Sequence, residues 1–177
     1  MRRLVDAGRL VRFMDAFGRA ARDRQSGRVY LAGGASAVLL DWRTSTVDVD
    51  IKLSPSLEPL LRVVPELKEQ LEINVELASP GDFIPELPGW EDRSPFIGRY
   101  GSVDFHHYDF YAQALSKIER GHERDSQDVA AMHASGLVER TRLLELFARI
   151  EPELYRYPAI DPPSFRRAVE EVAQTWR

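Results

Sequence analysis

Two aspartates alternate with apolar residues in the segment VDVDI, and no other feature restricts the fold of this chain as strongly. Side chains two positions apart in a β-strand share a face, so Asp48 and Asp50 are expected together on one face. The opposite face, expected to point into the core, then carries Val47, Val49 and Ile51. Neighbouring carboxylates repel one another unless a cation lies between them. Mg²⁺ prefers oxygen ligands, so the pair predicts a magnesium site, with Mn²⁺ as the alternative ion. A solvated strand face is the other interpretation of the pair.

A pair of glycines, Gly33 and Gly34, follows the apolar residues 29–32 and precedes a stretch with helical periodicity. Backbone N–H groups at the start of a helix favour a bound phosphate, and glycines let the phosphate approach closely. Ser36 adds a hydroxyl in the same turn. A tight turn without a ligand is the alternative. Together with the acidic pair, the turn predicts nucleotide chemistry.

Composition limits the classes of protein to which the chain can belong. Its 177 residues predict one domain, or one domain with a small helical appendage. The absence of cysteine excludes disulfides and thiolate metal sites, and the net charge of −4 argues against a dedicated nucleic-acid-binding protein. No apolar run is long enough to span a membrane, and the N-terminus is arginine-rich and amphipathic rather than a signal peptide. We therefore expect a cytoplasmic protein without membrane association.

Hydrophobic periodicity predicts one helix, then alternating strands and helices, then helices alone. This order predicts an α+β fold. The stretch 79–101 is rich in proline and glycine and predicts a long loop with a hairpin near its end. The expected helices are 4–22, 35–42, 57–70 (with a break at Pro65), 109–120, 123–135, 139–150 and 163–176, and the expected strands are 29–32, 47–53, 71–78 and 103–108.

The two glycines, thirteen intervening residues and then Asp48-Val49-Asp50-Ile51 resemble the hG[GS]…DhDh pattern of the nucleotidyltransferases related to DNA polymerase beta. Within that superfamily the chain is most similar to the minimal prokaryotic AbiEii-like toxin nucleotidyltransferases, in which Arg and Thr precede the paired aspartates. The resemblance covers about residues 28–78 and continues more weakly to about 133. It implies a nucleotide-binding role for Gly33, Gly34, Ser36, Arg43 and Thr46.

The resemblance implies a small mixed β-sheet flanked by helices and followed by a C-terminal helical segment. The expected division is a nucleotidyltransferase core at 1–108 and a helical segment at 109–177 packed on the core. Family members hold their metal with three acids. Glu76 is the expected third acid, because it lies near the end of a strand that is expected to carry Glu72, Asn74 and Glu76 on one face. Asp104, on the next strand, is the rival candidate.

A second group of charged residues lies in the helical part. Lys117 and Arg120 are three positions apart on one expected helix, and Asp125 and Asp128 are three apart on the next. The pattern resembles the C-terminal lysine and aspartate motifs of the AbiEii-like group, with Lys117 and Asp128 in the matching positions. This implies catalytic roles for both residues, with the lysine and Arg120 meeting the nucleotide triphosphate. A salt-bridged pair of surface helices is the alternative.

The function that the resemblance implies is Mg²⁺-dependent transfer of a nucleoside monophosphate from an NTP to a hydroxyl of RNA, tRNA or protein. Such an enzyme can serve as the toxin of a toxin–antitoxin pair, with an antitoxin protein as its partner. The alternative function is a non-catalytic nucleotide-binding or antitoxin-like module that keeps the same fold.

Overall fold

The computed structural model describes residues 3–21 and 26–176, which form two compact units. The first, called here the sheet unit, comprises the chain up to Ser79 together with Ser94–Tyr108. The second, the helical unit, comprises Pro80–Arg93 and the chain from Asp109 onward. The loop segment Pro80–Arg93 therefore belongs with the C-terminal helices, although it lies between two strands in the sequence.

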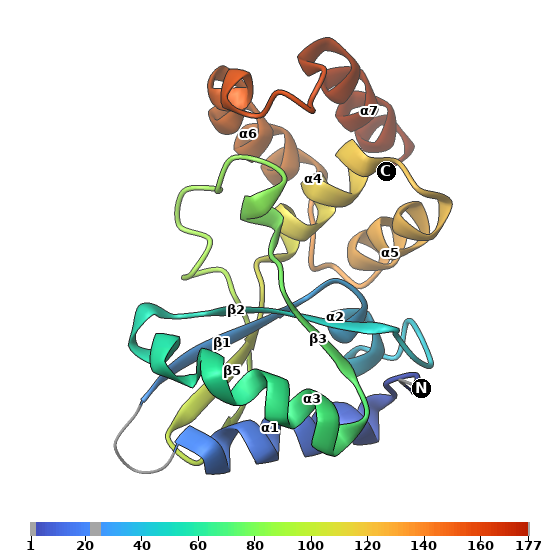
Figure 1. Cartoon of the computed structure of the whole chain (residues 1–177). Coiled ribbons are helices and arrows are strands. Elements are labelled where there is room, and N and C mark those ends of the chain that lie inside the picture. The colour runs from blue at the N-terminus through green and yellow to red at the C-terminus, as the bar shows by residue number, and fades with distance from the viewer. Residues whose placement is uncertain (1–2, 22–25, 177) are drawn as a thin grey trace. The chain divides into compact units, whose positions relative to one another are not determined.

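The sheet unit contains a five-stranded mixed sheet in the order β3-β2-β1-β5-β4 (Figure 1). Strand β1 pairs in parallel with β5 and antiparallel with β2, β2 pairs in parallel with β3, and β4 pairs antiparallel with β5. This mixed sheet flanked by helices confirms the predicted α+β fold and agrees with a nucleotidyltransferase-type architecture. The strands are β1 (Gly27–Ala32), β2 (Asp48–Leu53), β3 (Asn74–Leu77), β4 (Phe96–Tyr100) and β5 (Val103–His107).

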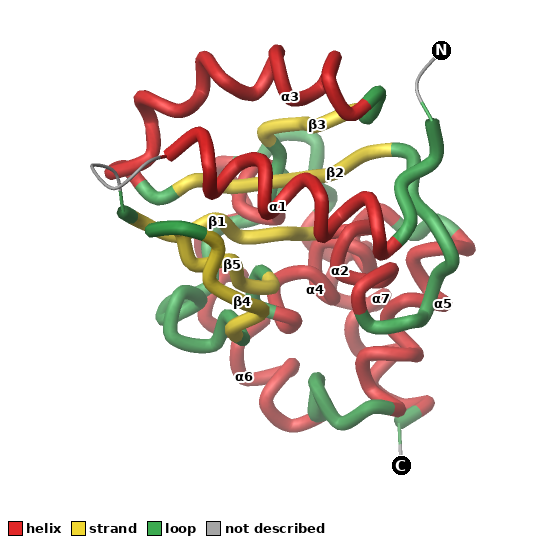
Figure 2. The backbone as a smooth tube through the Cα atoms, turned by 90° about the horizontal axis from the view of Figure 1, so that it is seen from below, coloured by secondary structure: helices red, strands yellow, loops and turns green. Residues whose placement is uncertain are grey.

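Helices α1 (Ala7–Ala21) and α3 (Val64–Leu71) lie on one face of the sheet (Figure 2), and α2 (Gly33–Leu39) follows β1 directly. The aromatic rings of Phe13 and Phe17 in α1 meet Phe105 of β5 edge-on, with centroids 6.4 and 6.0 Å apart. Edge-to-face pairs of this kind add to the free energy gained from apolar burial. This core covers one face of the sheet and leaves the alternate positions of β2 and β3 on the other.

The structure corrects three details of the sequence prediction. Residues 57–70 are broken near Pro65, as predicted, but the part before the break is not α-helical. A 3₁₀ helix, η1 (Pro55–Val63), is followed by α3, which has Pro65 in its first turn, where a missing N–H breaks no helical hydrogen bond. Val47 precedes β2 and is 57% exposed instead of joining the core. Glu72 caps α3 in a left-handed conformation (φ 55°), so only Asn74 and Glu76 share the predicted face of β3.

The helical unit confirms the four helices predicted for the C-terminal part. They are α4 (Phe110–Arg120), α5 (Glu123–Ala134), α6 (Arg140–Ile150) and α7 (Pro162–Thr175), with 3₁₀ turns η2 (Pro80–Asp82) and η3 (Glu151–Arg156). The buried Asp109 caps α4 by accepting a hydrogen bond from the Tyr111 N–H, and it also pairs with Arg93 at 2.7 Å. That ion pair joins the loop to the first turn of α4. Within the described residues, no helix combines the length and apolar character needed to cross a membrane.

Gly18 lets α1 approach the β4–β5 turn closely. A Cβ atom added there would lie 2.6 Å from the carbonyl carbon of Tyr100, which is backbone and cannot rotate away. We expect Gly18→Ala to reduce the free energy of unfolding by about 1–3 kcal/mol, because α1 must shift off the turn. Urea unfolding monitored by circular dichroism measures the change.

Gly8→Ala is the matched control in the same helix. A Cβ at Gly8 meets only the Asp6 carboxylate, at an ordinary 3.4 Å. Alanine there should leave stability unchanged or raise it by about 0.5–1 kcal/mol, because glycine is the poorer helix former. If the two substitutions changed the free energy of unfolding equally, close packing of α1 at Gly18 against the turn would not be important for stability.

Candidate functional site

Three carboxylates share one face of the adjacent strands β2 and β3. Asp50 lies opposite Glu76 in the parallel register, and Asp48 lies opposite Asn74. Register partners in a sheet point to the same side, so Asp48, Asp50 and Glu76 form one group, called here the carboxylate cluster. The apolar residues that alternate with Asp48 and Asp50 along β2 are Val49 and Ile51, and both are buried in the core, as the alternation predicts. The structure thus brings together the three acids that the sequence analysis selected.

Asn74 lies within the carboxylate cluster. Its side-chain nitrogen donates one hydrogen bond to Asp48 Oδ1 (2.7 Å) and another to Glu76 Oε1 (2.8 Å). The amide therefore joins carboxylates on two different strands. The sequence pattern predicted no role for Asn74, although its position two residues before Glu76 was a usable signal.

The glycine turn adjoins the cluster. Gly33 has a left-handed conformation (φ 59°), and a Cβ atom there would lie 2.7 Å from Asp50 Oδ2. Only glycine fits this conformation without strain while its backbone runs this close to the carboxylate. A Cβ at Gly34 would overlap the Thr46 side chain and lie 3.6 Å from a guanidinium nitrogen of Arg43. Four of the residues implied in nucleotide binding thus lie beside the carboxylate cluster.

Ser36, the fifth of these residues, has a different environment. Its side chain is fully buried, and its hydroxyl donates to the Leu31 carbonyl at 3.0 Å. The same oxygen lies 3.0 Å from His107 Nδ1. Because the hydroxyl hydrogen goes to Leu31, Nδ1 is the donor in this contact, which fixes the histidine tautomer. Ser36 therefore ties α2 to β1 and β5, and its hydroxyl is used inside the core.

Asp104, the rival third acid, lies elsewhere on the sheet. Asp50, on β2, lies opposite Ala32 at the end of β1. Asp104 is on β5, which pairs with the other edge of β1, and it lies opposite Arg28 near the beginning of that strand. Arg99 binds Asp104 through two hydrogen bonds of 2.6 and 2.8 Å. These bonds hold the pKa of Asp104 below its usual range, against a partial burial that would raise it. Asp104 is thus an arginine-paired residue apart from the cluster.

The chemistry of the cluster fits a hard divalent cation. Asp48 and Asp50 offer carboxylate oxygens on one face of β2, and Asp50 lies beside the Gly33 turn. Across residues 3–21 and 26–176, no group of three or more histidine or acidic side chains is placed to hold a metal ion. Mg²⁺ does not need one, because it commonly takes one or two protein carboxylates and completes its shell with water and substrate phosphates. The residues present therefore fit a shared protein–substrate magnesium site.

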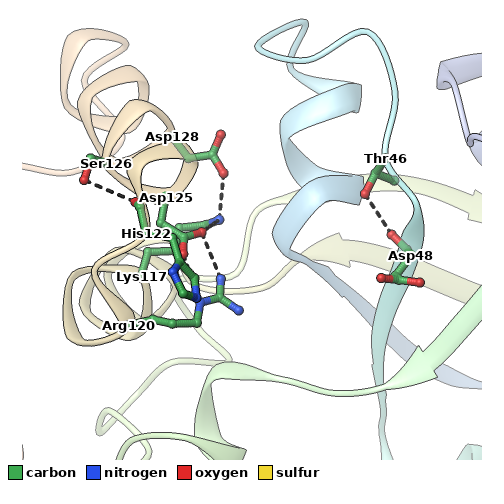
Figure 3. Close-up of polar contacts among 8 residues, drawn as sticks. All are labelled: Thr46, Asp48, Lys117, Arg120, His122, Asp125, Ser126 and Asp128. Carbon is green, nitrogen blue, oxygen red and sulfur yellow. Dashed lines mark hydrogen bonds and ion pairs between the residues drawn. The ribbon is translucent and has the colours of Figure 1, made fainter.

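The second predicted group is a buried ion cluster in the helical unit (Figure 3). Lys117 Nζ lies 2.6 Å from Asp128 and 3.1 Å from Asp125, and all three side chains are at most 6% exposed. Arg120 donates two further hydrogen bonds of 2.9 Å to Asp125. Burial would raise the pKa of Asp125, but the bonds from Arg120 and the charge of Lys117 outweigh it and hold the pKa low. The two helices are salt-bridged as the alternative interpretation expected, but Lys117 and both aspartates are buried.

A pocket of about 390 Å³ opens beside this ion cluster, between α4, α5 and α7. Lys117 lines it together with apolar side chains that include Ile118, Val129 and Trp176. Lys117 thus forms part of the pocket wall, while its ammonium group is bonded to two aspartates. His122, at the start of α5, is exposed.

A family model described as "Nucleotidyltransferase of unknown function (DUF6036)" matches residues 10–177. No curated protein and no solved structure matches the chain. The match covers both the carboxylate cluster and the buried ion cluster.

The pH dependence of stability tests the environment of His107, whose ring contacts Ser36 in the helix that follows the glycine turn. Burial, with a smaller contribution from the charge of His106, lowers the pKa of His107 from 6.5 to about 4. Between these values the unfolded chain binds a proton that the folded chain does not, so stability falls as the pH decreases through this window. The loss from this residue should reach about 3 kcal/mol. Urea unfolding at several pH values from 7 to 4 measures it.

His107→Asn removes the titrating ring and keeps a nitrogen donor near Ser36. The variant should lose less stability than the wild type between pH 6.5 and pH 4, whatever its stability at pH 7. His122→Gln, a change at an exposed histidine, should retain the wild-type acid dependence. If the stability of His107→Asn fell with pH as steeply as that of the wild type, His107 would not be the group that loses its proton on folding.

Proposed function

The chain belongs to the family of nucleotidyltransferases of unknown function (DUF6036), and from this membership we propose that it transfers a nucleoside monophosphate from an NTP to a hydroxyl acceptor with the help of Mg²⁺. The observation that carries the proposal is the carboxylate cluster beside the Gly33 turn. Three acids on one face, one of which lies close to the Gly33 backbone, suit a metal–triphosphate ligand.

In this proposal Asp48 and Asp50 hold the metal, and Glu76 is the third acid. When bound, the ion supplies charge neutralisation at the phosphates and a Lewis acid at the reacting phosphoryl group. Asp104 has no role in the reaction, because Arg99 already neutralises it on another part of the sheet.

The glycine turn and its neighbours are proposed to bind the phosphates. The partly exposed Gly33 would let a phosphate approach the backbone, and the Arg43 guanidinium supplies a permanent positive charge. Thr46 donates from its hydroxyl to the Asp48 carbonyl at 3.1 Å, so it fixes the start of β2 relative to the turn. We assign Ser36 the supporting role of holding the turn through the Leu31 carbonyl.

The reaction forms a bond between the acceptor oxygen and the α-phosphorus. The bond from this phosphorus to the bridging oxygen of the β-phosphate breaks, pyrophosphate leaves and the hydroxyl proton is released. The proposed acceptors are RNA, tRNA or a protein hydroxyl, as the resemblance to the AbiEii-like toxins implies. A toxin role opposed by an antitoxin protein belongs to the same proposal, as does a cytoplasmic location.

A non-catalytic nucleotide-binding module is the second candidate function. The observation that favours it is that, among the residues described by the structure, no three histidine or acidic side chains are placed to hold a metal ion together. Magnesium-dependent NTP binding without release of pyrophosphate, tested with total RNA and total protein as acceptors, would select this candidate over the first.

We expect Asp48→Asn and Asp50→Asn to reduce nucleotide transfer to background. Each change removes a proposed metal ligand and also relieves repulsion between neighbouring carboxylates, so the melting temperature should remain at or above that of the wild type. Incorporation of α-labelled NTP into RNA or protein measures transfer. Calorimetric titration with Mn²⁺ measures metal binding.

Asp104→Asn is the matched control, since it makes the same chemical change on the same sheet but outside the carboxylate cluster. It should keep transfer and metal affinity near wild-type values. Activity that survives in Asp48→Asn or Asp50→Asn, or is lost equally in Asp104→Asn, would refute the assignment of the cluster.

The role of Lys117 in nucleotide binding is a separate proposal about the helical unit. We expect Lys117→Met to weaken NTP affinity by roughly ten- to a thousandfold, equivalent to the ~1.5–4 kcal/mol lost when a charge-assisted contact is removed from a partly dry site. Metal affinity in the absence of nucleotide should not change. Titration with a fluorescent NTP analogue in Mg²⁺ measures the difference.

Asp128→Asn separates this role from a purely structural one. Both substitutions break the 2.6 Å ion pair and should lower the melting temperature, because each leaves a partner charge uncompensated. Only Lys117→Met removes the ammonium, so only it should weaken NTP binding. Equal NTP affinities in the two variants would assign Lys117 to the stability of the helical unit alone.

A further inference from the structure

The Asn74 side chain lies between two carboxylates, a position where a positively charged group would be expected. Asp48 and Glu76 are both acceptors, and one neutral amide nitrogen between them donates to each at 2.7 and 2.8 Å. Two carboxylates that share a face repel one another unless something positive or hydrogen-donating separates them. The amide supplies two N–H donors without a net charge. It therefore holds the carboxylates together without neutralising them.

We propose that Asn74 is a positioning residue that arranges the carboxylate cluster for a divalent cation. The inference rests on the proposed function, since it takes the cluster as the metal site. A carboxylate has two oxygens, so Asp48 and Glu76 can each accept from Asn74 with one oxygen and present the other to the ion. Hydrogen bonds of this kind orient metal-binding carboxylates and raise their affinity for the metal.

The register explains why an asparagine at this position can reach both partners. Asn74 lies opposite Asp48 on the neighbouring parallel strand and two residues before Glu76 on its own strand, so both carboxylates are on its face. An aspartate in its place would add a fourth carboxylate to the face, and a lysine would put a permanent charge where the ion binds. Asparagine meets both requirements, because it donates hydrogen bonds and leaves the negative charge available.

The first experiment measures the melting temperature in EDTA. Asn74→Asp replaces both N–H donors with a carboxylate of the same shape, so we expect it to melt at least about 3 °C below the wild type. Mn²⁺ should then raise the melting temperature of Asn74→Asp by more than it raises that of the wild type, because the cation replaces the missing donors. Equal melting temperatures in EDTA would overturn the proposal.

The second experiment measures Mn²⁺ affinity by calorimetry, without nucleotide or acceptor. Asn74→Ala should bind Mn²⁺ roughly ten- to a hundredfold more weakly than the wild type, the range typical of a lost hydrogen bond to a metal ligand. An Asn74→Ala protein that melts cooperatively and binds Mn²⁺ as tightly as the wild type would refute a positioning role.

Gln70→Glu is the matched control for charge. It adds the same negative charge as Asn74→Asp, at an exposed position of α3 outside the carboxylate cluster. Its melting temperature in EDTA and its Mn²⁺ affinity should equal those of the wild type. If the wild type itself binds no divalent cation, the proposed function fails. The melting temperatures in EDTA still decide whether Asn74 holds the carboxylates together, so the two failures are distinguishable.

Discussion

The alternation of β2 is the constraint on which the sheet unit depends. This strand pairs on both sides, with β1 and β3, and its apolar positions Val49 and Ile51 are buried against the helices. A shift of one residue in register would bury Asp48 and Asp50 and expose both apolar side chains, at a cost of several kcal/mol. The burial of one face therefore fixes the carboxylates on the other. The position of the proposed metal site therefore follows from the packing of the core.

Patterns that depend on neighbours in the sequence were predictable. The spacing of Asp48 and Asp50 determined their common face, and the glycine pair after a strand indicated a turn, in which Gly33 has a left-handed conformation. The C-terminal helices were predictable for the same reason, since Gly121 and Gly136 end helical patterns with positive φ angles. In each case one local interaction determines the structure, so the sequence alone is sufficient.

Contacts between distant segments were not predictable, because sequence spacing says nothing about which strands become neighbours. Ser36 was expected to face a phosphate, yet its hydroxyl bonds within the core because β5 brings His107 against it. Glu72 was assigned to a strand by alternation, but the left-handed end of α3 removes it from that strand. Asn74 was seen only as a member of a polar face, since its bond to Asp48 depends on the parallel pairing of β2 and β3.

The buried ion cluster and the carboxylate cluster differ in how far their negative charges are balanced by positive ones. In the helical unit, Lys117 and Arg120 face Asp125 and Asp128, so two positive charges balance two negative ones and the buried group is satisfied by its own members. In the carboxylate cluster, the donor between Asp48 and Glu76 is an amide, which contributes hydrogen bonds but no charge. A cation therefore has more to gain electrostatically at the cluster than at the ion group. This difference makes the face of β2 and β3 the stronger candidate for the catalytic site.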